Sequence, residues 1–80
     1  MQFKRWTHPK TDEQRVYVNG HNEKGIRVYF TRSDVADFPM IHLQGNFVAP
    51  GQRQRLEEKC GEAAMSAGNG TWTGLWEAAK

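Results

Sequence analysis

Apolar and polar residues alternate in two stretches of the first third of the chain. "RVYV" at residues 15–18 and "IRVYF" at residues 26–30 have a period of two and are rich in β-branched and aromatic side chains, as strands are. The segment between them, "NGHNEKG", contains glycine and asparagine, which tolerate positive φ. The pattern predicts an antiparallel hairpin whose loop is longer than the tightest class.

Two further stretches predict strands. "QFKRWT" at residues 2–7 has an extended composition and leads into "HPKTDE", where the proline and the Thr-Asp-Glu run favour a turn. "MIHLQ" at residues 40–44 alternates, with its isoleucine and leucine on one face and its methionine, histidine and glutamine on the other. We therefore expect three or four strands.

The hydrophobic period changes after Pro50. Apolar residues then occur at i, i+4, i+7, i+8 and i+11, which is one stripe of an α-helix: Leu56, Cys60, Ala63, Ala64 and Ala67. This spacing predicts a helix over about residues 50–67, with Pro50 in its first turn and Gly68 as its C-terminal cap. Gly61 costs this helix about 1 kcal/mol relative to alanine. We interpret it as allowing the helix to lie close against the sheet.

The last ten residues, "TWTGLWEAAK", predict a short helix over about residues 72–79. Its apolar residues fall at i, i+3, i+4 and i+7, at Trp72, Leu75, Trp76 and Ala79. Thr71 or Thr73 suits the N-cap. A helix this short is not stable alone, so it must dock on another surface. We interpret its stripe as core, and the alternative is a docking helix for a partner's groove.

These elements predict an α+β fold with one antiparallel sheet of three to four strands. The helix over about 50–67 covers one face, and the C-terminal helix over about 72–79 closes an edge. Eighty residues leave room for one hydrophobic core, so residues 1–80 are expected to form a single domain.

The hairpin register determines which side chains share the face turned away from the core, which we call the outer face. The simplest register that buries all the aliphatic residues sets Val16 opposite Val28. The repeated tripeptide Arg-Val-Tyr then places two Arg–Tyr pairs on the outer face, Arg15 with Tyr29 and Arg27 with Tyr17. Each guanidinium is placed to lie over a neighbouring ring.

The first strand contributes to the outer face as well. Phe3 and Trp6 are three residues apart and cannot both point inward from a regular strand. If Trp6 points inward, Phe3 and Arg5 join the outer face, whereas a bulge would turn both rings inward. We expect the outer face to hold the partner-binding residues Arg5, Arg15, Tyr17, Arg27 and Tyr29, with Lys4, Lys24 and Arg32 at its rim.

Charge and composition narrow the partner and the compartment. The net charge is +2, but residues 1–32 contain seven basic and three acidic residues, a local charge of +4. An anionic partner is therefore expected to meet this part of the chain. The lone Cys60 excludes an internal disulfide and suits a reducing compartment. No apolar run approaches the roughly 18 residues of a membrane span, so we expect a cytoplasmic protein that does not bind membranes.

Catalytic and metal signatures are weak. Zinc-ligand types are present, but their spacing matches no compact metal motif: His8, His21, His42 and Cys60. Cys60 lies on the apolar stripe and is interpreted as packing, with a Cys60 nucleophile and a His42 base as the disfavoured alternative. The carboxylates of "DVAD" are interpreted as capping groups. We expect no enzyme activity, no metal and no cofactor.

The opening "WTHPKTDEQRVYVNG" resembles the start of small accessory proteins carried by phages and related mobile elements. Several of these open with a Trp-Thr-His-Pro turn that leads into an Arg-x-Tyr-x-Asn strand. The size and style of the chain are also similar to anti-CRISPR proteins. The resemblance implies a non-enzymatic inhibitor that docks on a host defence complex of CRISPR–Cas type in the bacterial cytoplasm. It assigns no role to a particular residue.

The sequence thus favours a binding protein that engages a host protein or ribonucleoprotein through a basic and aromatic sheet face, with a monomer as the favoured state. The alternative is a small nucleic-acid-binding domain that uses the same face for base stacking and phosphate contact. A third interpretation leaves that face without a partner, either solvated or covered by the C-terminal helix.

Overall fold

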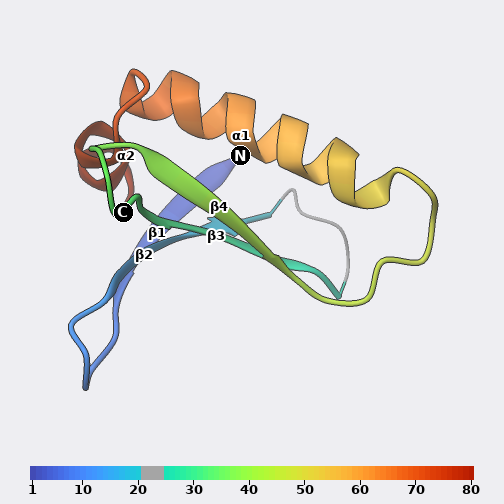
Figure 1. Ribbon diagram of the computed structural model, residues 1–80, viewed down its shortest axis with the longest axis horizontal. Coiled ribbons are helices and arrows are strands. Elements are labelled where there is room, and N and C mark those ends of the chain that lie inside the picture. Colours follow the sequence, from blue (N-terminus) through green and yellow to red (C-terminus); the bar gives the residue numbers. More distant parts are fainter. Residues whose placement is uncertain (21–24) are drawn as a thin grey trace.

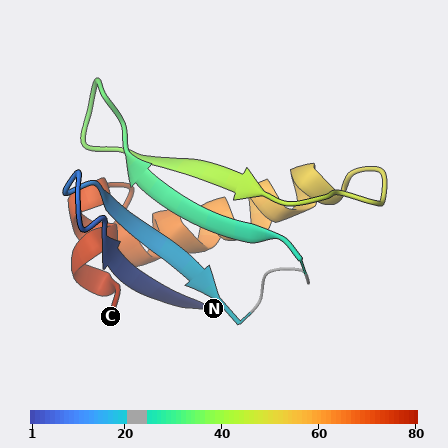
Figure 2. The ribbon, with the colours of Figure 1, turned by 90° about the horizontal axis from the view of Figure 1, so that it is seen from below.

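The computed structural model describes residues 1–20 and 25–80 (Figure 1). The chain forms four strands and then two helices: β1 (Gln2–Thr7), β2 (Gln14–Asn19), β3 (Arg27–Arg32), β4 (Pro39–Gln44), α1 (Gln52–Gly68) and α2 (Trp72–Ala78). The strands make one antiparallel sheet in the order β1-β2-β3-β4. Helix α1 lies against one face, so the predicted α+β fold is confirmed (Figure 2).

The core lies between the sheet and the two helices. Its buried members are the inward side chains of the hairpin, the stripe of α1 and the apolar residues at the C-terminus: Val16, Val18, Ile26, Val28, Phe30, Leu56, Cys60, Ala64, Trp72, Leu75 and Ala79. These confirm the predicted burial of the hairpin valines and of Trp72, Leu75 and Ala79 in the C-terminal stripe, whose fourth member, Trp76, is half-buried. Ala67, which was predicted on the apolar stripe of α1, is exposed and lines an open pocket between α1 and the start of β1.

The ends of α1 differ from the prediction in their details. Gly51 is the N-cap, in the left-handed region with φ 77°, so Pro50 precedes the helix and does not form its first turn. Gly68 is the last helical residue, and the left-handed cap is Asn69 with φ 52°. A Cβ on Gly68 would lie 2.6 Å from the backbone nitrogen of Leu75. Gly68 is therefore required for the close packing of α2 on the end of α1.

The interpretation of Gly61 was wrong. A Cβ at this position would meet no atom within 4 Å, so the glycine does not mediate close packing of α1 on the sheet. It leaves a space on the β4 side of the helix instead, beside Met65.

Helix α2 is fixed at its N-terminus by its own cap and by the loop between β3 and β4. The hydroxyl of Thr71 accepts a hydrogen bond from the Gly74 amide at 3.0 Å, which confirms Thr71 as the N-cap. Asp37 accepts two more, one at its carboxylate from the Thr73 amide at 3.0 Å and one at its carbonyl from the Trp72 amide at 3.3 Å. Of the two carboxylates in "DVAD", Asp37 thus caps a helix, as predicted.

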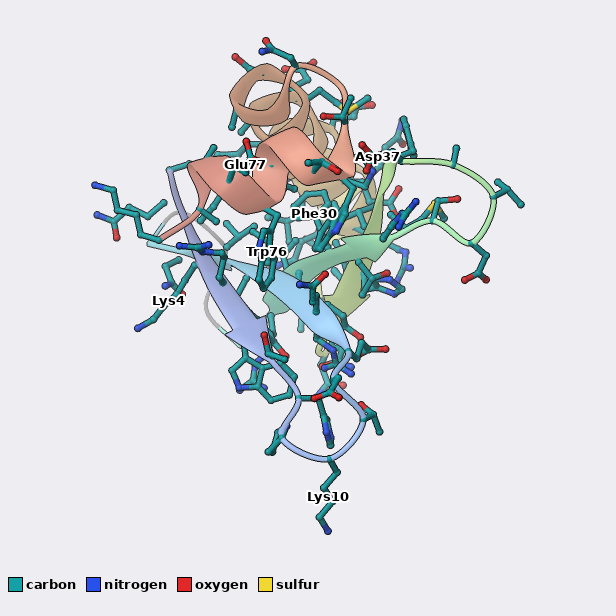
Figure 3. The ribbon with its side chains drawn as sticks, turned by 90° about the vertical axis from the view of Figure 1, so that its left-hand side faces the viewer. Lys4, Lys10, Phe30, Asp37, Trp76 and Glu77 are labelled. Atoms are coloured by element: carbon teal, nitrogen blue, oxygen red, sulfur yellow. The ribbon has the colours of Figure 1, made fainter. Side chains whose placement is uncertain are left out.

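The residues after α2 close the β1 edge of the sheet. The Arg5 amide donates to the Lys80 carbonyl at 3.3 Å, and the Lys80 amide donates to the Phe3 carbonyl at 3.0 Å. Figure 3 shows Trp76 pointing from α2 toward the sheet, with Asp37 beside the start of the helix. Helix α2 packs on the same side of the sheet as α1, so it does not cover the outer face.

The hairpin register differs from the predicted one by two residues. Val16 lies opposite Phe30, and Tyr17 lies opposite Tyr29. A shift of two keeps every side chain on its own face, so burial alone does not separate the two registers. The outer face therefore keeps its expected arginines and tyrosines from β2 and β3, but their cross-strand partners change.

The expectation for β1 was also wrong. Phe3 lies opposite Val18 and Arg5 opposite Val16, so both point to the α1 side. Trp6 points to the outer face, because the strand is paired without a bulge. Phe3 contacts Phe30 edge-on, with ring centroids 6.3 Å apart. Phe3 and not Trp6 is thus the ring that β1 adds to the core.

Candidate functional site

All four strands contribute to the outer face. The pairings of β1, β2, β3 and β4 place twelve side chains there, on the side away from α1: Gln2, Lys4, Trp6, Arg15, Tyr17, Asn19, Arg27, Tyr29, Thr31, Met40, His42 and Gln44. This set contains no carboxylate. The outer face is therefore basic and aromatic, as expected.

Four rings form a continuous row across the outer face, which we call the aromatic row. Trp6 and Tyr17 meet edge-to-face with centroids 5.9 Å apart, and Tyr17 and Tyr29 are tilted at 5.2 Å. Tyr29 and His42 are stacked at 4.7 Å with an angle of 11° between their planes. Each strand supplies one ring, so the row links the two edges of the sheet.

Arginine side chains lie between the rings of the row. The guanidinium carbon of Arg15 is 4.6 Å from the centre of the Tyr29 ring and 5.3 Å from that of Trp6. The guanidinium of Arg27 lies 5.9 Å from the Tyr17 ring. These are the two predicted Arg–Tyr stacks, made diagonally between strands. Each contributes about 0.5–1 kcal/mol at an exposed site.

Arg15 is held in place by polar contacts as well. Its Nε donates to a carboxylate oxygen of Glu13, and its Nη1 donates to the Tyr17 hydroxyl at 3.0 Å. The hydrogen bond to Tyr17, followed by the one to Glu13, raises the pKa of Arg15. The guanidinium thus stays charged and fixed over the rings, while Glu13 offsets part of its charge.

Lys4 and Arg27 carry positive charges that are less offset by carboxylates than the charge of Arg15 is. Among the residues that the structure describes, neither forms an ion pair with a carboxylate. Both side chains are exposed. An approaching anionic group therefore meets these two cations with little competition from the protein itself.

The rings differ in how much of them a partner can reach. Tyr29 is only 7% exposed, since Arg15 lies over its ring and His42 stacks on it. The His42 ring is itself fixed by a 2.8 Å hydrogen bond between its Nε2 and the Thr31 hydroxyl. Trp6 is 38% exposed. A partner can thus reach Trp6 and the edges of the row, while its centre supports them.

The structure brings five of the eight predicted partner-binding residues together on the outer face: Lys4, Arg15, Tyr17, Arg27 and Tyr29. Arg5 does not belong to the outer face. It points to the α1 side, where its guanidinium lies 5.5 Å from the Trp76 ring. Arg32 shares the α1 side with Phe30, because the β3–β4 pairing is regular. Lys24 lies outside the described residues.

Sequence reasoning missed Trp6 and His42 as members of the site. The alternation of "MIHLQ" placed His42 on the outward side of its strand, but not within reach of Tyr29. The side of Trp6 depends on the pairing of β1 with β2, which the alternation within one strand does not determine. No signal within β1 alone decides which of Phe3 and Trp6 enters the core, since residues three apart lie on opposite faces of a regular strand.

The disfavoured Cys60–His42 pair is not formed. Cys60 is buried on the sheet-facing side of α1, where desolvation raises the pKa of its thiol, while His42 lies on the opposite face of the sheet. Within residues 1–20 and 25–80, no three His, Cys, Asp or Glu side chains are grouped as a metal site. His8 accepts hydrogen bonds at Nδ1 from the Lys10 and Thr11 amides, so it shapes the β1–β2 turn. His21 lies outside the described part of the chain.

Comparison with known proteins adds no relative: no protein family, curated protein or solved structure matches the chain. Neither described helix is long and apolar enough to cross a membrane.

Proposed function

We propose that the chain is a non-enzymatic binding protein that docks on a protein or ribonucleoprotein surface through its outer face. The observation that carries the proposal is the aromatic row with Arg15 and Arg27 lying over its rings. Tryptophan, tyrosine and arginine are the residues that dominate binding energy in protein interfaces.

The packing of the outer face favours a binding role over a merely solvated surface. Arg15 is bonded to Glu13 and Tyr17, and His42 is bonded to Thr31, so these side chains are already ordered. Ordering a flexible side chain at an interface costs about 0.5–1.5 kcal/mol, and a preorganised face avoids part of that cost. Trp6 is the exposed ring available as an anchor.

The charge of the outer face indicates an acidic contact surface on the partner. Lys4 and Arg27 are exposed and flank Tyr17 on neighbouring strands. Opposite charges on the partner would speed association and fix the register of docking. Phosphates of a bound guide RNA and acidic side chains both meet this requirement.

The partner class follows from the resemblance to phage accessory proteins. The chain acts as a phage-encoded inhibitor of a host defence complex of CRISPR–Cas type, in the cytoplasm of the bacterial host. It inhibits by occupying a surface, one copy for one site, without catalysis or a cofactor.

Direct binding of single-stranded nucleic acid is the second candidate. A row of rings interleaved with cations is the arrangement that stacks bases and holds phosphates. Packing within the row ranks this candidate lower, since the Tyr29 ring is already covered by Arg15 and His42. A base would have to displace one of them before it stacked there.

The test uses purified CRISPR effector complexes and measures cleavage of their target nucleic acid. We expect the native chain to inhibit at least one complex at about one copy per complex, and Trp6→Ala to weaken inhibition at least about tenfold. Val35→Ala is the matched control, because Val35 is an exposed apolar residue in the β3–β4 loop, off the outer face. Equal inhibition by Trp6→Ala and the native chain would contradict the proposal.

A second titration separates the two candidates. Fluorescent single- and double-stranded oligonucleotides are mixed with the native chain at low and moderate salt. Binding that weakens steeply with salt supports the nucleic-acid candidate, because released counterions drive such binding. No binding at micromolar concentrations leaves protein docking.

A further inference from the structure

The two edges of the sheet differ in whether another part of the chain forms backbone hydrogen bonds with them. At the β1 edge, Lys80 pairs with Phe3 and Arg5 through backbone hydrogen bonds. At the other edge, β4 is the outermost strand, and within the described residues no backbone bond reaches its outer side (Figure 2). An open edge presents a row of unpaired amides and carbonyls, which is a template for another strand.

The β4 edge also lacks the usual protection against pairing. Its six residues, "PMIHLQ", include no lysine, arginine, aspartate or glutamate, and Pro39 stands only at the first position. Folded proteins commonly protect such edges with charges, bulges or a proline within the strand. The closed β1 edge, in contrast, carries Lys4 and Arg5. The charges thus lie on the edge that the chain covers itself.

An apolar hollow of about 280 Å³ lies beside β4 on the α1 side. It is lined by Phe30, Phe38, Pro39, Met40, Ile41, Gly61 and Met65. Two of the side chains around it stay more than a third exposed: Phe38 at 42% and Met65 at 37%. Gly61 contributes no side chain to the hollow, and a Cβ there would meet no atom within 4 Å. Gly61 thus has no packing role within the single chain and leaves room for a side chain from outside.

We propose that the β4 edge is a self-association surface, on which a second copy of this chain adds its own β4 antiparallel about a two-fold axis. An antiparallel edge is complementary to itself, and isologous two-fold dimers are the commonest oligomers. The uncharged edge supports this occupant, because two copies bring no like charges together across the new pairing.

Self-pairing also fills the hollow. Antiparallel addition brings the late residues of one β4 beside the early residues of the other. Leu43 of the second copy then lies on the α1 side opposite Ile41, which lines the hollow. The two-fold axis repeats this contact, so both hollows are covered.

The dimer leaves the outer face open and does not depend on the proposed function. The two sheets become one sheet of eight strands, and the aromatic rows of both copies end side by side at His42. If the outer face docks on a partner, the dimer presents two such faces on one rigid body.

The test is sedimentation equilibrium of the purified chain from low to high micromolar concentration. We expect a monomer–dimer equilibrium in this range. Gly61→Leu fills the hollow and Met40→Lys/Gln44→Lys places lysines opposite each other across the new pairing. Each variant is expected to raise the dissociation constant of the dimer at least about tenfold. Ala67→Leu is the matched control, since Ala67 is exposed on α1 away from the hollow, and it should dimerise like the native chain.

Gly61→Leu keeps the test independent of folding failure, because leucine favours the helix and should raise the melting temperature of the monomer while it removes the dimer. A native chain that stays monomeric throughout overturns the proposal and leaves the β4 edge to a strand from another protein. A dimer that persists unchanged in either variant also overturns it, because the contact then lies elsewhere.

Discussion

On the α1 side of the sheet, Phe30 packs edge-on against Phe3 and is excluded from water, whereas on the outer face Tyr17 packs between Trp6 and Tyr29 and stays partly exposed. The inner rings are covered by two helices and stabilise the fold mainly through buried apolar area. The outer rings are covered by each other, by His8 and by arginines. One sheet thus uses aromatic residues as a core on one face and as a preformed surface on the other.

Replacing one ring on each face gives the largest expected contrast. Phe30→Ala should lower the free energy of unfolding by about 3–5 kcal/mol, because it leaves a cavity in the core. Tyr17→Ala should lower it by about 1–2 kcal/mol, from lost ring contacts on a surface that water can fill. Urea denaturation followed by far-UV circular dichroism measures both. Equal losses would show that the outer face is part of the stabilising core.

The two glycines of α1 differ in their surroundings, because Gly68 is packed tightly against α2 whereas Gly61 faces open space. Gly68→Ala should destabilise by about 1–3 kcal/mol, because its Cβ would meet the backbone of Leu75 at 2.6 Å. Gly61→Ala should stabilise by about 1 kcal/mol, because a Cβ there meets no atom within 4 Å. The shift in urea midpoint at low protein concentration checks both. A Gly61→Ala variant that loses stability would mean that α1 lies closer to β4 than described.

Arg15 tests whether cation–π contacts hold the outer face together. Arg15→Gln removes the stacks on Trp6 and Tyr29 and should cost about 1–2 kcal/mol, while Arg27→Gln removes one stack and should cost about 0.5–1 kcal/mol. Thermal unfolding of the two variants in parallel gives the difference. If Arg27→Gln proved the more damaging of the two, the central place of Arg15 in the row would be wrong.

The smallest expected effect is the pH dependence of stability that the buried thiol of Cys60 causes. Cys60 lies on the α1 side of the sheet, so this effect does not involve the outer face. Burial raises the pKa of its thiol in the folded chain, so the unfolded chain loses this proton first as the pH rises. Stability is therefore fully present below the ordinary thiol pKa of about 8.5 and decreases above it, by at most about 1.4 kcal/mol per pH unit. Urea midpoints at neutral and alkaline pH measure the loss. Cys60→Ala should lose less between the two, and an equal loss would assign the effect to other groups.

Side-chain alternation within each strand predicted much of this comparison. It placed Val16, Val28 and Phe30 on one face and Tyr17 and Tyr29 on the other, and the structure agrees. Such patterns succeed because burial selects residues at a fixed spacing along the strand. The helix ranges were predicted to within about two residues, because burial also selects apolar residues at the helical spacing.

Relations between strands were harder to predict. The register of β2 and β3 was wrong by two residues, because an even shift leaves the burial of every side chain unchanged. The faces of Arg5 and Trp6 were exchanged, because they depend on how β1 pairs with β2. The hydrogen bond of His42 to Thr31 and its stacking on Tyr29 also join residues from different strands. Local pattern does not encode these contacts.

The most direct test of the outer face reverses one charge on each side of the same strand. Arg27 and Arg32 stand at the two ends of β3, both exposed, but Arg27 lies on the outer face and Arg32 on the α1 side. The measurement is the dissociation constant for the inhibited complex at fixed salt. We expect Arg27→Glu to raise it at least about tenfold and Arg32→Glu to change it less than about twofold. Equal effects, or a larger effect from Arg32→Glu, would contradict the assignment of binding to the outer face.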